Sequence, residues 1–75
     1  MNKIVLFESE NGNFYFYSYL KKMFFSLDRI EYSILRDIES GIDFMDSLSK
    51  NCLTNSIDEY QKRIRYYLNI FVYNT

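Results

Sequence analysis

The alternation of hydrophobic and polar residues divides the chain into a strand-rich first third and a helical remainder. Over residues 56–71 the apolar positions recur at three- and four-residue steps, which is typical of an amphipathic helix. This stripe consists of Ile57, Tyr60, Ile64, Tyr67, Leu68 and Phe71. Ser56 and Glu59 have the spacing of a capping box, so the pattern predicts a helix over 56–71 and a short extended tail over 72–75.

Three short apolar runs precede the helical part, at residues 3–8, 13–19 and 22–27, and predict strands. The second run alternates, with Phe14, Phe16 and Ser18 on one face and Tyr15, Tyr17 and Tyr19 on the other. We expect the phenylalanine face to point into the core and the tyrosine face to lie outside with its hydroxyls in water. A tyrosine binding strip is the alternative interpretation.

The dipeptide Asn11-Gly12 separates the first two runs. It is the strongest short signal for a two-residue hairpin turn, because both positions accept a positive φ angle. A turn at this position fixes the register of the hairpin. The predicted pairs are Phe7 with Phe16, Leu6 with Tyr17, and Ile4 with Tyr19.

The third run follows a second predicted turn at residues 20–22. Both of its faces contain a phenylalanine, so the pattern does not assign the core face; Phe25 belongs to the more apolar set. A meander of three strands leaves the third strand at an edge, where only Lys22 supplies a charge. An edge with so little charge is a template for pairing with another chain, and it also makes an edge-to-edge homodimer plausible.

Two further helices are predicted between the strands and the last helix, over residues 28–40 and 43–50. Asp28 with Glu31 forms an acidic capping box, Gly41 is a left-handed C-cap, and Asp43 caps the second helix. The order of elements predicts one α+β domain over residues 1–75. Its three-stranded antiparallel meander is followed by three helices, in a winged-helix-like arrangement.

The amino-acid composition limits the kinds of function that the protein can have. The 75 residues include 7 Phe and 8 Tyr, a rich core for a small domain, and the formal net charge is −1. The chain has no histidine and one cysteine, Cys52, which leaves no basis for histidine-centred catalysis, a cysteine zinc cage or an internal disulfide. We therefore expect no enzyme, no catalytic or metal site and no cofactor.

The apolar runs are too short for a signal-peptide core or a membrane span, so a cytoplasmic protein without membrane contact is expected. Abundant Ile, Asn, Lys and Tyr suggest a bacterial or phage genome. A DNA-binding winged helix is one alternative, with Lys62, Arg63 and Arg65 on the last helix. The acidic Asp58 and Glu59 and the negative net charge make a nucleic-acid partner the weaker interpretation.

The order of elements resembles that of a RiPP precursor peptide recognition element. The resemblance covers most of the chain. It consists of the strands leading into residues 27–35, Gly41, the short capped helix at 43–45, and the spaced apolar residues of the last helix. Ser40 stands where the family often has Asp, and Asp43 where it often has Thr or Ser. Such domains are similar to the peptide chaperone of pyrroloquinoline quinone biosynthesis and to the N-terminal domains of radical SAM peptide maturases.

The resemblance implies that the domain binds the leader of a ribosomal precursor peptide and delivers it to a peptide-modifying enzyme. In the family the leader adds as a strand to the edge of the third strand, in a groove against the last helix. Carried over by position, the peptide-binding residues are Lys22, Met23, Phe24, Phe25, Ser26, Tyr60, Arg63, Ile64 and Tyr67. The main rival is a small phage or mobile-element protein that inhibits or adapts a larger protein through the same edge or through the tyrosine face.

Overall fold

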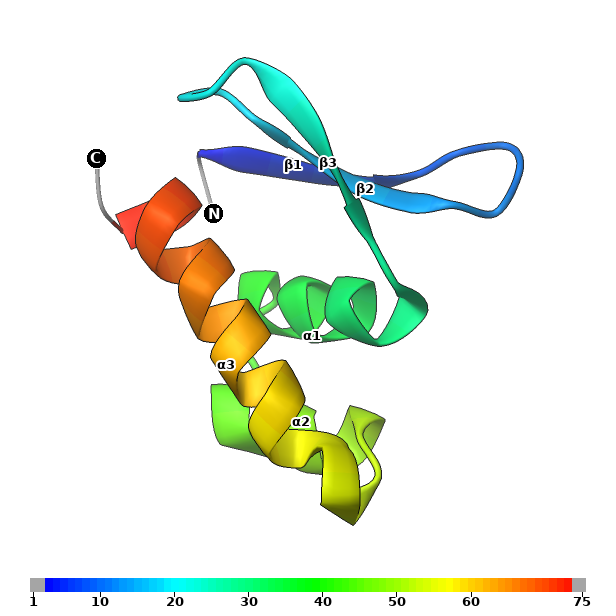
Figure 1. Cartoon of the computed structure of the whole chain (residues 1–75), viewed down its shortest axis with the longest axis vertical. Coiled ribbons are helices and arrows are strands. Elements are labelled where there is room, and N and C mark those ends of the chain that lie inside the picture. Colours follow the sequence, from blue (N-terminus) through cyan, green and yellow to red (C-terminus); the bar gives the residue numbers. More distant parts are fainter. Residues whose placement is uncertain (1–2, 74–75) are drawn as a thin grey trace.

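The computed structural model describes residues 3–73 and consists of an antiparallel sheet followed by helices (Figure 1). The strands are β1 (Ile4–Glu8), β2 (Phe14–Ser18) and β3 (Met23–Leu27), in the spatial order β1-β2-β3. The helices are α1 (Arg29–Glu39), α2 (Phe44–Asn51) and α3 (Ile57–Tyr67). Figure 1 shows α1 next to the sheet, α2 farther from it, and α3 running past both toward the sheet. The predicted α+β arrangement is confirmed.

The first hairpin closes through a longer loop than Asn11-Gly12 alone would form. The Ser9 N–H donates to the Asn13 carbonyl at 2.8 Å, so the loop contains three residues and ends at Gly12, whose φ is +82°. A left-handed glycine at the end of a three-residue loop is a common hairpin geometry. The predicted register is therefore wrong by one residue. The observed pairs are Ile4 with Ser18, Leu6 with Phe16, and Phe7 with Tyr15.

The one-residue shift decides which side chains of β1 enter the core, because side chains alternate between the two faces of a strand. Ile4 and Leu6 are buried beside Phe16, while Val5 and Phe7 lie on the outer face of the sheet with Tyr15. The buried face of the sheet therefore combines the aliphatic residues of β1 with the phenylalanines of β2.

The second turn contains four residues, because Ser18 pairs with Met23. Lys22 lies in this turn, with a left-handed φ of 56°, and its N–H donates to the Ser18 carbonyl at 2.7 Å. β3 therefore begins at Met23, one residue later than predicted. Phe25 pairs with Phe16 on the inner face, which decides between the two faces that the sequence left open.

The helices pack on the inner face of the sheet and complete the core. Its fully buried hydrophobic side chains come from β2 and all three helices, and they are Phe16, Ile34, Leu35, Leu48 and Ile64. Within residues 3–73, no helix is long and apolar enough to cross a membrane.

The caps of α1 and α2 agree with the sequence. Asp28 and Glu31 form the predicted capping box, with bonds of 2.7 and 2.8 Å to each other's backbone N–H. Gly41 adopts φ +92° after α1, and the N–H of Ile42 donates to the Asp37 carbonyl, which together form a Schellman cap. Asp43 accepts from two N–H groups at the start of α2.

Both ends of the last helix differ from the prediction. Ser56 ends a 3₁₀ turn (Thr54–Ser56), and its hydroxyl donates to the Leu53 carbonyl, so the capping box with Glu59 does not form. Beyond α3 the chain continues as a π-helix, Leu68–Tyr73, which we call the π-segment. The extended tail predicted at 72–73 is therefore wrong, and residues 74–75 lie outside the described range. Phe71 explains the continuation, because it packs on Phe16 and Phe25.

Candidate functional site

The edge of β3 is the first component of the candidate site. Among the described residues, β3 pairs only with β2, so its other side keeps unpaired backbone groups. Its side chains are unusually exposed for apolar residues, with 61% of Phe24 and 51% of Met23 accessible. Of the predicted edge residues, Met23, Phe24, Phe25 and Ser26 lie on β3, and Lys22 lies in the turn before it.

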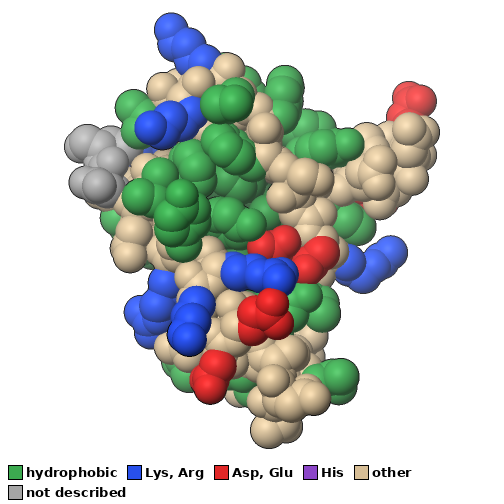
Figure 2. All heavy atoms as spheres, viewed as in Figure 1, with side chains coloured by type: hydrophobic (Ala, Val, Ile, Leu, Met, Phe, Trp, Pro, Cys, Tyr) green, Lys and Arg blue, Asp and Glu red, His purple; other side chains and the backbone are tan. Residues whose placement is uncertain are grey.

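The inner side of this edge faces the end of the last helix. The rings of Phe25 and Phe71 are 4.6 Å apart, and the ring of Tyr67 lies 5.6 Å from that of Phe16. Phe25 and Phe71 therefore pack together between β3 and the π-segment. Figure 2 shows hydrophobic side chains gathered over the sheet and the C-terminal helix, above a band of acidic and basic side chains.

The predicted helical residues Tyr60, Arg63 and Tyr67 all face the start of α1. The Tyr60 hydroxyl donates to Asp28 Oδ2 at 2.7 Å, and the Tyr67 hydroxyl donates to Glu31 Oε2 at 2.8 Å. Arg63 bridges the same region, 2.6 Å from Glu59 and 3.5 Å from Asp28. The polar ends of these three side chains therefore bind the capping box of α1.

The carboxylates of the capping box change the acidity of both tyrosines. The hydrogen bond to Asp28 is the main cause that raises the pKa of Tyr60 to about 12. Burial is the main cause for Tyr67, with the hydrogen bond to Glu31 adding to it, and its pKa also rises to about 12. Both phenols are hydrogen-bond donors at neutral pH, because ionisation would place a second negative charge beside a carboxylate.

Ile64 differs from the other predicted helical site residues. Its side chain is 0% exposed and belongs to the hydrophobic core, so it does not reach the surface beside β3. The helical stripe could not separate Ile64 from Tyr60 and Tyr67, because all three lie on the same side of α3. Ile64 lacks the polar end that lets a tyrosine extend from the core to the surface.

A second exposed feature lies on the outer face of the sheet. Phe7 stacks on Tyr15 at 5.4 Å and meets Phe24 edge-on at 5.5 Å, and Tyr17 lies 5.0 Å from Phe24. We call these four residues the outer aromatic cluster. Phe7, Tyr15 and Phe24 line a shallow, wholly apolar depression of about 310 Å³. Phe7 was not predicted as a surface residue from the sequence. Ile4 and Leu6 share the buried face of β1, so Phe7 lies on the opposite, outer face.

Within the described part of the chain, no three His, Cys, Asp or Glu side chains lie close enough to hold a metal ion. The thiol of Cys52 is half-buried, and burial, with the negative charge of Asp28, raises its pKa. A thiol with a raised pKa is a weak nucleophile at neutral pH.

Comparisons of the chain with models of protein families, with curated proteins and with solved structures gave no match.

Proposed function

We propose that this protein is a non-catalytic peptide-binding domain of the bacterial cytoplasm. It captures the leader of a ribosomal precursor peptide by strand addition at β3 and presents it to a separate modifying enzyme. The observation that carries the proposal is the edge of β3, which pairs with no further strand among residues 3–73 and has exposed apolar side chains on both of its faces. Strand addition at such an edge is an established mode of peptide recognition.

The two faces of β3 would contact alternate side chains of the added strand. Side chains on the outer face would lie beside Phe24, and those on the inner face beside Met23 and Phe25. Both environments are apolar, so the best ligand is an extended segment with hydrophobic residues on both faces. Lys21 and Lys22, which are exposed in the turn before β3, favour an acidic residue at that end of the peptide.

An amide chemical-shift titration tests the proposal. The labelled protein is mixed with leader peptides encoded by open reading frames adjacent to its gene. The expected shifts are at Lys22–Ser26, Tyr67 and Phe71. A matched control peptide carries N-methyl groups at alternate residues, which removes strand hydrogen bonds and keeps the side chains. Binding that survives this change, or a folded sample that responds to no leader, would contradict strand addition.

An adaptor or inhibitor of a larger protein, of phage or mobile-element origin, is the second candidate. The outer aromatic cluster favours it, because it brings the exposed Phe24 and three half-buried rings together, and aromatic residues are enriched at protein interfaces. In this case a partner protein would shift the resonances of Phe7 and Tyr15, while leader peptides would shift nothing.

DNA binding is less well supported. Arg63 is paired with Glu59 and Asp28, and the Arg65 guanidinium lies over the ring of Phe44. These contacts compete with phosphate for the two arginines of α3, and the chain as a whole is slightly acidic.

A further inference from the structure

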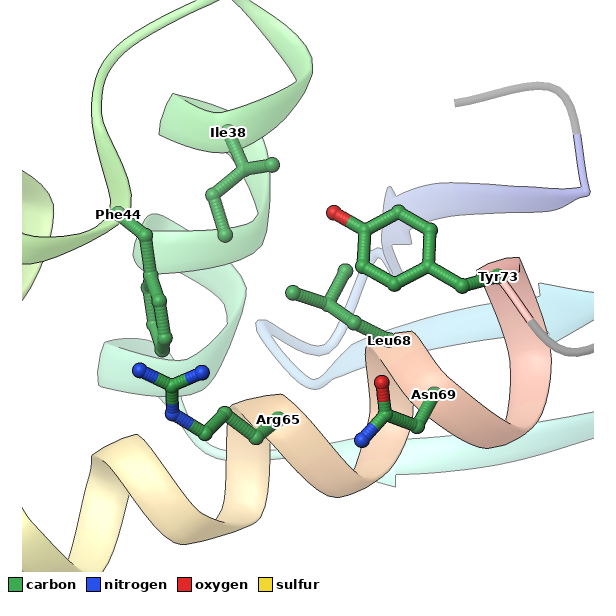
Figure 3. Close-up of a pocket in the computed structure, with 6 residues that line it drawn as sticks. All are labelled: Ile38, Phe44, Arg65, Leu68, Asn69 and Tyr73. Atoms are coloured by element: carbon green, nitrogen blue, oxygen red, sulfur yellow. The ribbon is translucent and has the colours of Figure 1, made fainter.

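A cavity of about 270 Å³ lies on a different part of the molecule, between α1, the start of α2 and the end of the last helix (Figure 3). We call it the Arg65 pocket. It is lined by Ile38, Phe44, Arg65, Leu68, Asn69 and Tyr73. None of these residues belongs to the candidate site at β3, so this pocket is independent of the proposed function.

The pocket combines apolar walls with three polar side chains. Ile38, Phe44 and Leu68 supply the apolar surface, and Figure 3 shows Arg65, Asn69 and Tyr73 arranged around it. The lining contains no carboxylate. Its size is near the lower end for small-ligand pockets and suits a group about as large as one amino acid.

The helix geometry explains why the three polar residues lie together. Arg65, Asn69 and Tyr73 are spaced four residues apart across the junction between α3 and the π-segment. An α-helix has 3.6 residues per turn, so a side chain four residues further on is rotated slightly around the helix axis. A π-helix has more than four residues per turn, so the same spacing rotates the side chain in the opposite direction. The two rotations offset each other, and the three side chains stay on one side of the helix.

Arg65 has no acidic partner among residues 3–73, unlike Arg36 and Arg63. Its guanidinium lies 5.4 Å from the centre of the Phe44 ring. When the neutral amide of Gln61 is oriented with its oxygen toward Arg65, that oxygen accepts from Nε at 3.3 Å and from Nη2 at 3.0 Å. A guanidinium held over an aromatic ring keeps N–H groups at its edge, where they can donate to a carboxylate.

The polar side chains of Asn69 and Tyr73 make no hydrogen bond within the described part of the chain. The guanidinium N–H groups that do not bond to Gln61, an amide and a phenol thus surround the apolar pocket. All three side chains are exposed, so a ligand can reach their donors. We propose that the Arg65 pocket binds a carboxylate attached to a short apolar group. Arg65 would pair with the carboxylate, Asn69 and Tyr73 would donate hydrogen bonds to it, and the apolar group would lie against Phe44, Ile38 and Leu68.

Two sources could supply this chemistry, a free small acid or the C-terminal residue of a peptide. The test is an amide-shift titration of the labelled full chain with 4-methylpentanoate and, separately, with N-acetyl-leucine. The neutral control is 4-methylpentanamide. Saturable shifts at Asn69 and Tyr73 with an acid, and none with the amide, are expected. Tighter binding of N-acetyl-leucine identifies a peptide C-terminus as the source, and tighter binding of 4-methylpentanoate identifies a free acid.

Variants then test the role of Arg65. We expect Arg65→Gln to weaken binding of the acid about tenfold or more, the value of a charge-assisted hydrogen bond. Lys62→Gln removes the same charge from an exposed position of α3 outside the pocket, and should bind the acid normally. Asn69→Leu, which keeps Arg65, should weaken binding as well. The proposal is overturned if neither acid causes saturable shifts, if the amide binds equally well, or if Lys62→Gln loses as much affinity as Arg65→Gln.

Discussion

The hydroxyl of Tyr67 donates to Glu31 across 36 residues of sequence, over a distance of 2.8 Å. Glu31 is only 5% exposed, and its other carboxylate oxygen accepts the Asp28 N–H in the capping box of α1. One buried side chain thus caps the start of α1 and anchors α3. Tyr60 makes the equivalent bond to Asp28, so α3 holds both members of the box.

Tyr67→Phe should destabilise the protein by about 1.5–3 kcal/mol, because it leaves an oxygen of a buried carboxylate without its donor. Tyr66→Phe is the matched control. Tyr66 is exposed and makes no hydrogen bond through its hydroxyl within residues 3–73, so its loss should change stability by less than about 0.5 kcal/mol. Urea unfolding of both variants measures the difference. Equal unfolding free energies would show that the Glu31 bond adds nothing to stability.

Stability should fall in alkaline solution as the two linked tyrosines ionise. The pKa values of Tyr60 and Tyr67 rise from the ordinary 10.0 to about 12 in the folded protein. A raised folded pKa contributes stability that is fully present below the unfolded value of 10 and is lost as the pH rises toward 12. Urea midpoints measured across this range should decline less steeply in Tyr60→Phe/Tyr67→Phe than in the native chain. Parallel declines would contradict the assignment.

The element order and the α1 and α2 caps could be predicted because each depends on local chemistry. Asp28, Gly41 and Asp43 act on backbone groups within a few residues of themselves. The hairpin register could not be derived from Asn11-Gly12 alone. A two-residue and a three-residue loop both place Gly12 at a positive φ, and only burial of Leu6 beside Phe16 distinguishes them.

The candidate site was harder to predict because it depends on contacts between distant segments. The stripe of α3 correctly indicated that Tyr60 and Tyr67 face inward, but not that their hydroxyls bind Asp28 and Glu31. The π-segment depends on the packing of Phe71 between Phe16 and Phe25, which no local pattern reveals. The Arg65 pocket depends on that segment and was therefore not visible in the sequence.

The contact between α1 and α2 should weaken when Asp37 is neutralised. Its carboxylate accepts from the buried Ser47 hydroxyl at 2.8 Å and from the Asn51 amide at 3.0 Å, and it pairs with Lys50. Asp37→Asn should cost about 1–3 kcal/mol, because its neutral amide oxygen accepts more weakly from the buried Ser47 hydroxyl and its side chain no longer pairs with Lys50. Glu39→Gln, which affects only an exposed pair with Arg36, is the control and should cost less than about 0.5 kcal/mol.

The same carboxylate predicts an effect of acid. Burial raises the pKa of Asp37, but hydrogen bonds from Ser47, Asn51 and Lys50 outweigh it and leave the pKa below 3.8. A lowered folded pKa contributes stability that is present above 3.8 and is lost as the pH falls through the folded value. Thermal unfolding of native protein and Asp37→Asn should therefore converge in acid. A constant difference between the two curves would argue against this role.

Gly12 should tolerate only residues that accept a left-handed backbone. Its φ is +82°, and no atom lies within 4 Å of an added Cβ, so backbone strain alone decides the outcome. Gly12→Val should cost about 1–2 kcal/mol, whereas Gly12→Asn should cost less, because Asn enters this region more readily. Urea unfolding distinguishes the two variants. Equal costs would show that the loop can adopt another geometry.

Phe24→Asp should weaken leader binding at least tenfold, because it places a buried negative charge beside an apolar side chain of the added strand. Val5→Asp is the matched control. Val5 is an exposed apolar residue on the same outer face, but it lies on β1 at the opposite edge of the sheet. If strand addition occurs at β3, Val5→Asp retains normal affinity in the shift titration.

Equal loss of affinity in both folded variants would instead place the peptide across the outer face of the sheet. Loss in Val5→Asp alone would place it at β1. Either result would exclude β3 as the binding edge, because only a strand added there lies next to Phe24 and far from Val5.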